Sequence, residues 1–148
     1  MKRYFKGWYF KQQTSDGTVA VIPAIHMEDK AHCSASVQIV TDSGSYWKTF
    51  PRERFYADKR GIFVAVDKNL FSDKGVLLNI DSKECSAHGT LHFGELLPVK
   101  YDIMGFFKFV PGMECRHSVF SMAHRVSGTL EVNGKQYRFS DSDGIGYI

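Results

Sequence analysis

Short turn signals divide this chain into segments of strand length. Asn133-Gly134 separates Gly128–Val132 from Lys135–Phe139, and Asn-Gly is the strongest short hairpin signal because both residues tolerate the positive φ of a type I′ turn. Similar breaks stand at Asp16-Gly17, Asp42-Ser43-Gly44 and Asp73-Lys74-Gly75. Turns at intervals of roughly 8–14 residues are typical of β-sandwiches and β-barrels.

Between these turns, apolar residues recur at every second position. Val76, Leu78 and Ile80 share one face of their segment, opposite Leu77 and Asn79. The same period places on common faces Val37 with Ile39, Leu91 with Phe93, and Trp8 with Phe10. A period of two with one apolar face predicts antiparallel strands that each cover a core. We therefore expect an all-β, antiparallel fold, and the length of 148 residues predicts one domain over residues 1–148.

Two segments depart from the alternation. Arg52–Arg60 is rich in charge and is expected to be a loop or one helical turn. Met113–Val126 fits either state, because Val119, Met122, Ala123 and Val126 match a helix whereas Phe120, Met122, His124 and Val126 match one face of a strand. We favour the strand, since a predicted hairpin follows directly. At the end of the chain, Ile145, Tyr147 and Ile148 either dock into a sheet or mark a natural chain that continues.

Charge and cysteine content exclude several classes of protein. A net charge of +3 is too small to predict a nucleic acid as the main partner. The longest apolar stretch, Val19–Ile25, is broken by Pro23 and is shorter than the roughly 20 residues of a membrane helix. Contact with a membrane surface and self-association both stay open. An odd number of cysteines and a start without the apolar core of a signal peptide predict a reducing cytoplasm.

Aromatic residues are concentrated in two segments, Tyr4–Lys11 and Met104–His117. Rings at this density are rarely left on a soluble surface, because each buries a large apolar area. The second segment also places Glu114, Cys115, Arg116 and His117 next to one another. Apolar surroundings beside an ionisable cluster predict a pocket for an apolar small molecule.

Two carboxylates are candidates for acid chemistry. Burial raises the pKa of a carboxyl group and allows it to act as an acid near neutral pH, which draws attention to Glu114 in its apolar setting and to Asp143 beside Gly144. The structural alternatives are an ion pair of Glu114 with Arg116 or Arg125, and a turn formed by Asp143. The aromatic residues Trp8, Tyr9, Phe106 and Phe107 are either core or the wall of a ligand site.

Other kinds of site find little support. The possible metal ligands His26, His32, Cys33, Cys115, His117 and His124 lack the paired spacing of known sites, so we expect no bound metal. A lowered pKa of Cys115 would be the main route to a catalytic thiol, and no Gly-x-Ser-x-Gly motif is present. Gly144-Ile145-Gly146 lacks the third glycine of a dinucleotide loop, and we expect no cofactor.

The same motifs resemble the tocopherol cyclase family. The resemblance runs in order from residue 4 to the end and covers only the N-terminal half of longer members. It rests on Phe5–Lys11, Ala20–His26, Met104–Phe107, Val110–His117, Ser121–His124 and Asp143–Ile148. It implies a lipocalin-like (calycin) β-barrel, or a strongly bent sandwich, related to the paired barrels of carotenoid hydratases. Such a barrel would be incomplete at its C-terminal end.

The resemblance also implies an activity, the acid-catalysed cyclisation of an isoprenoid quinol or a related prenyl lipid. By this analogy Glu114 or Asp143 is the proton donor, and His117 or His124 orients it or takes the phenol proton. Aromatic and apolar side chains would line the site, namely Trp8, Tyr9, Phe107 and Met113.

Two other functions compete with the cyclase. One is a lipocalin-like module that binds an apolar lipid without catalysis, and the other is a structural domain whose interior is filled by its own side chains. An enzyme would point Glu114 or Asp143 into the cavity with a raised pKa. A carrier would hold both at the rim or in ion pairs.

Overall fold

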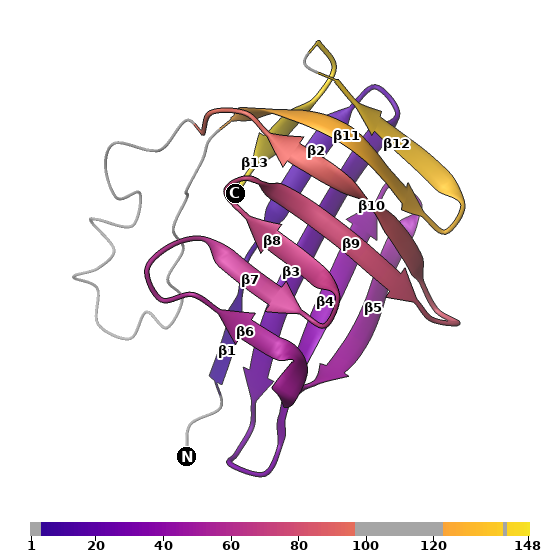
Figure 1. Ribbon diagram of the computed structural model, residues 1–148. Helices are drawn as coiled ribbons and strands as arrows, with labels where there is room; N and C mark the ends of the chain where they lie inside the picture. The colour runs from indigo at the N-terminus through magenta and orange to yellow at the C-terminus, as the bar shows by residue number, and fades with distance from the viewer. Residues whose placement is uncertain (1–3, 97–122, 141) are drawn as a thin grey trace, which may run out of the picture.

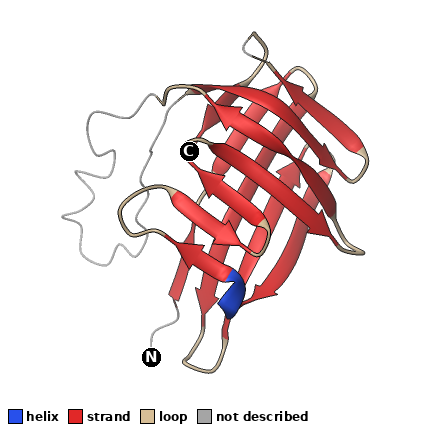
Figure 2. Cartoon of the chain, viewed as in Figure 1, coloured by secondary structure: helices blue, strands red, loops and turns tan. Residues whose placement is uncertain are grey.

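The described part of the chain is all-β. The computed structural model describes residues 4–96, 123–140 and 142–148. Within these ranges the helical structure consists of one 3₁₀ turn, η1 (Arg52–Arg54), which is the blue segment of Figure 2. This confirms the all-β expectation. In the same ranges, no helix is both long enough and apolar enough to cross a bilayer.

All the strands belong to one antiparallel sheet. They are β1 (Tyr4–Gly7), β2 (Phe10–Thr14), β3 (Gly17–Met27), β4 (Cys33–Thr41), β5 (Gly44–Pro51), β6 (Phe55–Ala57), β7 (Phe63–Val66), β8 (Asn69–Ser72), β9 (Gly75–Asp81), β10 (Ser86–Phe93), β11 (His124–Val132), β12 (Lys135–Phe139) and β13 (Ile145–Tyr147). Their order is β5-β4-β3-β2-β13-β11-β10-β9-β8-β7-β6, with β1 beside β3 and β12 beside β11. In the described residues β5 and β6 do not pair, so the sheet is not closed.

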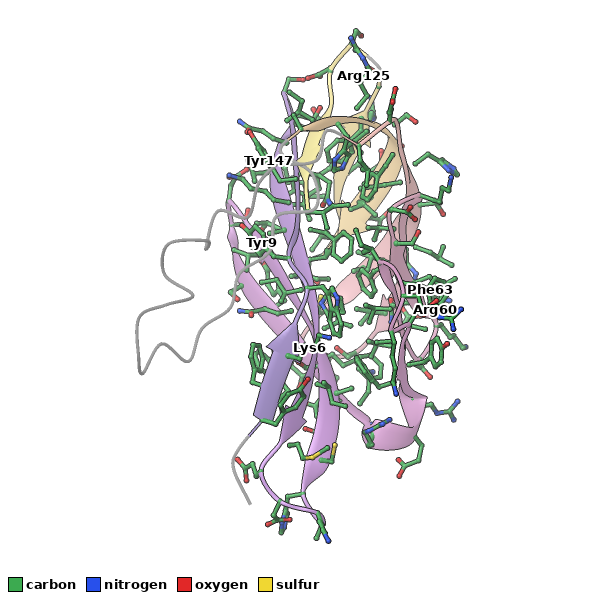
Figure 3. The ribbon with its side chains drawn as sticks, turned by 90° about the vertical axis from the view of Figure 1, so that its left-hand side faces the viewer. Lys6, Tyr9, Arg60, Phe63, Arg125 and Tyr147 are labelled. Carbon is green, nitrogen blue, oxygen red and sulfur yellow. The ribbon has the colours of Figure 1, made fainter. Side chains whose placement is uncertain are left out.

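The sheet bends so that its two halves face each other. In Figure 1, strands β6–β10 lie in front of β3–β5 and cross them. The core lies between the halves, where Val37 and Ile39 of β4 and Leu78 and Ile80 of β9 are all buried. Figure 3 shows side chains from both halves filling this space. The faces expected from the alternation are therefore confirmed for these strands.

Strands β1 and β2 form one interrupted strand along β3. Gly7 lies opposite Ala24, and Phe10 lies opposite Val21. The break falls opposite Pro23, which has no backbone N–H to donate. The backbone N–H of Trp8 still donates to the carbonyl of Pro23, at 3.0 Å. The chain therefore stays on the same track, and the alternation of faces carries through the break.

The charged segment Arg52–Arg60 is only partly a loop. Its first three residues form η1, as one helical turn would require, but Phe55–Ala57 then form strand β6. This strand pairs with β7 in register, with Phe55 opposite Val66. Strand β6 was not predicted from the sequence, because it has only three residues and charged residues lie on both sides of it.

The hairpin expected at Asn133-Gly134 is present. It joins β11 to β12, and Asn133 has a φ of 49°, in the left-handed region that a type I′ turn needs. The strand interpretation is also confirmed for the last residues of Met113–Val126, since β11 begins at His124. The earlier residues of that segment lie outside the described ranges.

Gly128, at the centre of β11, stands where the sheet leaves no room for a side chain. Its φ is 122°, and a Cβ at this position would collide with the backbone carbonyl oxygen of Thr90. We expect Gly128→Ala to lower the free energy of unfolding by about 3 kcal/mol, from backbone strain and overpacking together. The matched control is Gly61→Ala, because a Cβ there meets nothing within 4 Å. Chemical denaturation of both variants tests this, and equal stabilities would contradict it.

Candidate functional site

A row of three residues crosses the middle of the sheet where β13 lies between β11 and β2. Gly146 of β13 is opposite His124 of β11 on one side and opposite Gln12 of β2 on the other. Residues directly opposite in antiparallel strands project from the same face. The side chains of Gln12 and His124 therefore flank Gly146 on one face, with their Cα atoms about 10 Å apart, which is two strand spacings.

This face is the inner one. Gln12 is 0% exposed and His124 is 4% exposed. A Cβ on Gly146 would collide with Nε2 of His124, so the imidazole lies over the bare backbone of Gly146. The ring thus extends from β11 across β13, in the direction of Gln12.

Aromatic rings surround this row. The ring of Phe93 lies 4.5 Å from the imidazole of His124 and 6.5 Å from the ring of Phe10, centroid to centroid. Phe10 is fully buried and sits two residues before Gln12 on the same face of β2. The two polar side chains therefore project into a largely apolar environment.

The carboxamide of Gln12 is unusual among the buried polar groups. Thr14 donates its hydroxyl to the carbonyl of Arg138 at 2.7 Å, and Asn69 both donates to the carbonyl of Val66 and accepts from the N–H of Asn79. By contrast, neither side-chain polar atom of Gln12 has a hydrogen-bond partner in the described structure. An unpaired amide in an apolar interior costs about 1–3 kcal/mol.

His124 carries no charge at neutral pH. Burial lowers its pKa from 6.5 to about 4, because an imidazolium would lose its hydration in this environment. The neutral ring has one nitrogen that donates and one that accepts. Within residues 4–96, 123–140 and 142–148, the buried polar side chains are all uncharged; they are Gln12, Thr14, Ser36, Asn69 and His124.

Asp143 lies at the rim of the sheet rather than in its interior. Its carboxylate accepts hydrogen bonds from the hydroxyl and the backbone N–H of Ser15. Both bonds favour the charged form, and together they hold the pKa of Asp143 below its usual value. Asp143 therefore fastens the β12–β13 turn to the β2–β3 turn, which is the turn-forming alternative considered for it.

The two aromatic candidates of the N-terminal segment point in opposite directions. The indole of Trp8 is partly buried and packs against the core, with its ring 6.0 Å from that of Phe55 on β6. Tyr9 is 51% exposed. Figure 3 labels Tyr9 on the same side as Tyr147, opposite Phe63. Trp8 therefore belongs to the interior and Tyr9 to the outer face.

Four candidates fall in a part of the chain that is not described. They are the proposed acid Glu114, its partner His117, and the ligand-wall residues Phe107 and Met113. Their roles stay predictions. In the residues that are described, no group of three His, Cys, Asp or Glu side chains lies close enough together to hold a metal ion.

An open groove of about 840 Å³ runs beside β13. Its wall includes Asp143, Ile145 and Tyr147 at the surface, and it also includes the buried residues Thr14 and His124. His124 therefore belongs both to the inner row and to a groove that opens to solvent.

Sequence reasoning missed Gln12, Gly146 and Phe93 as site residues. For Gln12 a signal was available: the alternation that pairs Trp8 with Phe10 continues to Gln12, which places an amide on the apolar face. The other two carried no such signal, because Gly146 and Phe93 matter only through the strands that lie next to them.

The unpaired amide leads to a stability prediction. Gln12→Met keeps an unbranched side chain of similar length and removes the unsatisfied groups. We expect it to raise the free energy of unfolding by about 1–2 kcal/mol. Gln13→Met, on the exposed face of the same strand, is the control and should change stability by less than about 0.5 kcal/mol. A destabilised Gln12→Met variant with an intact control would show that the amide is paired in solution.

The lowered pKa of His124 leads to a prediction about pH. Between the unfolded pKa of 6.5 and the folded value of about 4, the unfolded chain binds more protons than the folded one. Stability therefore falls as the pH falls through this window, by about 2 kcal/mol from pH 7 to pH 5. His124→Gln removes the titrating group, so the difference between the two denaturation curves isolates the effect. Parallel curves for both proteins would contradict it.

The chain was compared with protein-family models, with curated proteins and with solved structures, and none of these comparisons gave a match.

Proposed function

We propose that this protein binds a small apolar molecule with one uncharged polar group, such as a prenyl quinol or another lipid. The observation that carries the proposal is the fully buried carboxamide of Gln12, which has no hydrogen-bond partner in the described structure. Buried polar groups in proteins are nearly always paired. An exception beside a neutral imidazole and aromatic rings is typical of a ligand site waiting for its ligand.

The surroundings of Gln12 support the same proposal. Phe93 and Phe10 offer apolar contact area to a ligand, and His124 offers a second neutral hydrogen-bonding group. His124 also lines the open groove beside β13, so one member of the row borders a pocket that opens to solvent. A structural domain with a self-filled interior would not explain why the amide lacks a partner.

The resemblance to tocopherol cyclases leads us to propose a lipocalin-like barrel as the fold that holds this ligand. The bent sheet supports it, because β4 lies against both β7 and η1 across the open side. Reducing conditions such as those of the cytoplasm fit the free thiols of Cys33 and Cys85.

We extend this proposal to tocopherol-cyclase-like catalysis, which requires a proton donor in addition to a binding site. Asp143 is a poor donor at neutral pH, because its hydrogen bonds with Ser15 favour the carboxylate. Its position at the rim of the sheet is the one expected of a protein that binds a lipid without catalysis. The acid of a cyclase would then be Glu114, and the aromatic wall would include Trp8.

Native mass spectrometry of the purified protein tests binding. We expect adducts with the mass of a lipid on the folded protein, their loss on unfolding, and the same result when a prenyl quinol is added to the delipidated protein. The spectrum also reports self-association. A folded protein that retains no lipid and takes up no prenyl quinol would refute the proposal and favour a structural domain.

Turnover of the same quinol tests the catalytic extension. We expect Asp143→Asn to leave turnover unchanged and Glu114→Gln to abolish it, with lipid adducts in both variants. Absence of turnover in the unmodified protein would limit the function to binding.

A further inference from the structure

The row of Gln12, Gly146 and His124 determines which polar group a ligand can present, an inference that rests on the proposed function. The amide of Gln12 offers a donor and an acceptor, and both are unused within the described residues. The neutral imidazole of His124 also has one nitrogen of each kind. Any group held between them must therefore match neutral donors and acceptors.

The residue between the two side chains in the ladder is a glycine, Gly146. His124 Nε2 lies so near Gly146 that a Cβ there would collide with it, and Gln12 is on the neighbouring strand at the same level. No side chain of β13 separates them on this face, so one small ligand group can approach both.

The absence of buried charged side chains in the described part of the chain limits which polar group a ligand can carry. No buried side chain in the described ranges carries a charge. A carboxylate brought into this site would lose its hydration without gaining a cation, which is a large cost. A hydroxyl can donate to one of the two side chains and accept from the other, at no such cost.

We propose that Gln12 and His124 together bind the hydroxyl of an apolar alcohol or phenol, and that the site rejects carboxylates such as fatty acids. Phe93 and Phe10 contact the apolar part next to that hydroxyl. Gln12 and His124 thus select the ligand by its polar end, whereas the surrounding rings accept many apolar chains.

Three probes with the same apolar part test this selection near neutral pH: para-octylphenol, octylbenzene, which has no polar end, and para-octylbenzoate. Calorimetry on the delipidated protein measures their affinities. We expect para-octylphenol to bind most tightly, octylbenzene about fivefold more weakly for the lost hydrogen bonds, and para-octylbenzoate most weakly.

Variants locate the effect. Gln12→Met should lower the affinity for para-octylphenol toward that of octylbenzene, because His124 keeps only one of the two hydrogen bonds, and it should leave octylbenzene binding unchanged. The control for binding is Gln136→Met, on the exposed face of β12 and outside the groove lining, and it should change neither affinity. Because Gln12→Met is expected to fold at least as stably as the unmodified protein, a loss of phenol affinity cannot be ascribed to unfolding, and a thermal melt checks this.

The outcomes separate the two proposals. If none of the probes binds the unmodified protein, the proposed binding function fails. If all three bind equally well, or if Gln12→Met binds para-octylphenol as tightly as before, binding stands and the selection by Gln12 and His124 is refuted.

Discussion

The backbone pairing of β13 joins the two halves of the sheet. This strand has three residues, yet it forms ladders with β2 on one side and β11 on the other. Without it, the path of the sheet would be interrupted between the N-terminal and C-terminal halves. The same pairing sets the register that places Gly146 between Gln12 and His124. The integrity of the sheet and the composition of the candidate site therefore depend on the same few backbone hydrogen bonds.

Gln12 and His124 are unfavourable residues for the stability of an apolar interior. Each is buried with polar atoms in an apolar interior, and each is more costly there than an apolar residue of the same size. Such costs are common where a protein must recognise a polar group, because an amide already paired inside the protein could not bind a ligand. Asn69 provides the contrast, since its amide is as deeply buried but is fully used by neighbouring backbone groups. Only the unpaired amide indicates recognition.

Much of the local structure could be predicted from the sequence, since it arises from short-range effects. The turn at Asn133-Gly134 and the buried faces of β4 and β9 follow from turn chemistry and a period of two. Strand β6 could not be predicted, because three residues between charged neighbours form a strand only when β7 lies beside them. Of the candidate site residues, His124 was predicted, together with its place on the apolar face, but its neighbours Gly146 and Phe93 on the adjacent strands were not. Asp143 was predicted as a possible proton donor. The hydrogen bonds from Ser15 that keep it ionised could not be predicted, because the two residues are far apart in the sequence.

By itself, the sequence determined the all-β class of fold and the buried face of the regularly alternating strands, because alternation and turn formation depend on residues close together in the chain. It also placed His124 on the apolar face of its strand. Only the tertiary structure decided that Gln12, at one end of the chain, meets Gly146 and His124 at the other. That meeting depends on the register of β13 between two strands that are more than a hundred residues apart, and register is set by hydrogen bonds between segments that no local pattern connects.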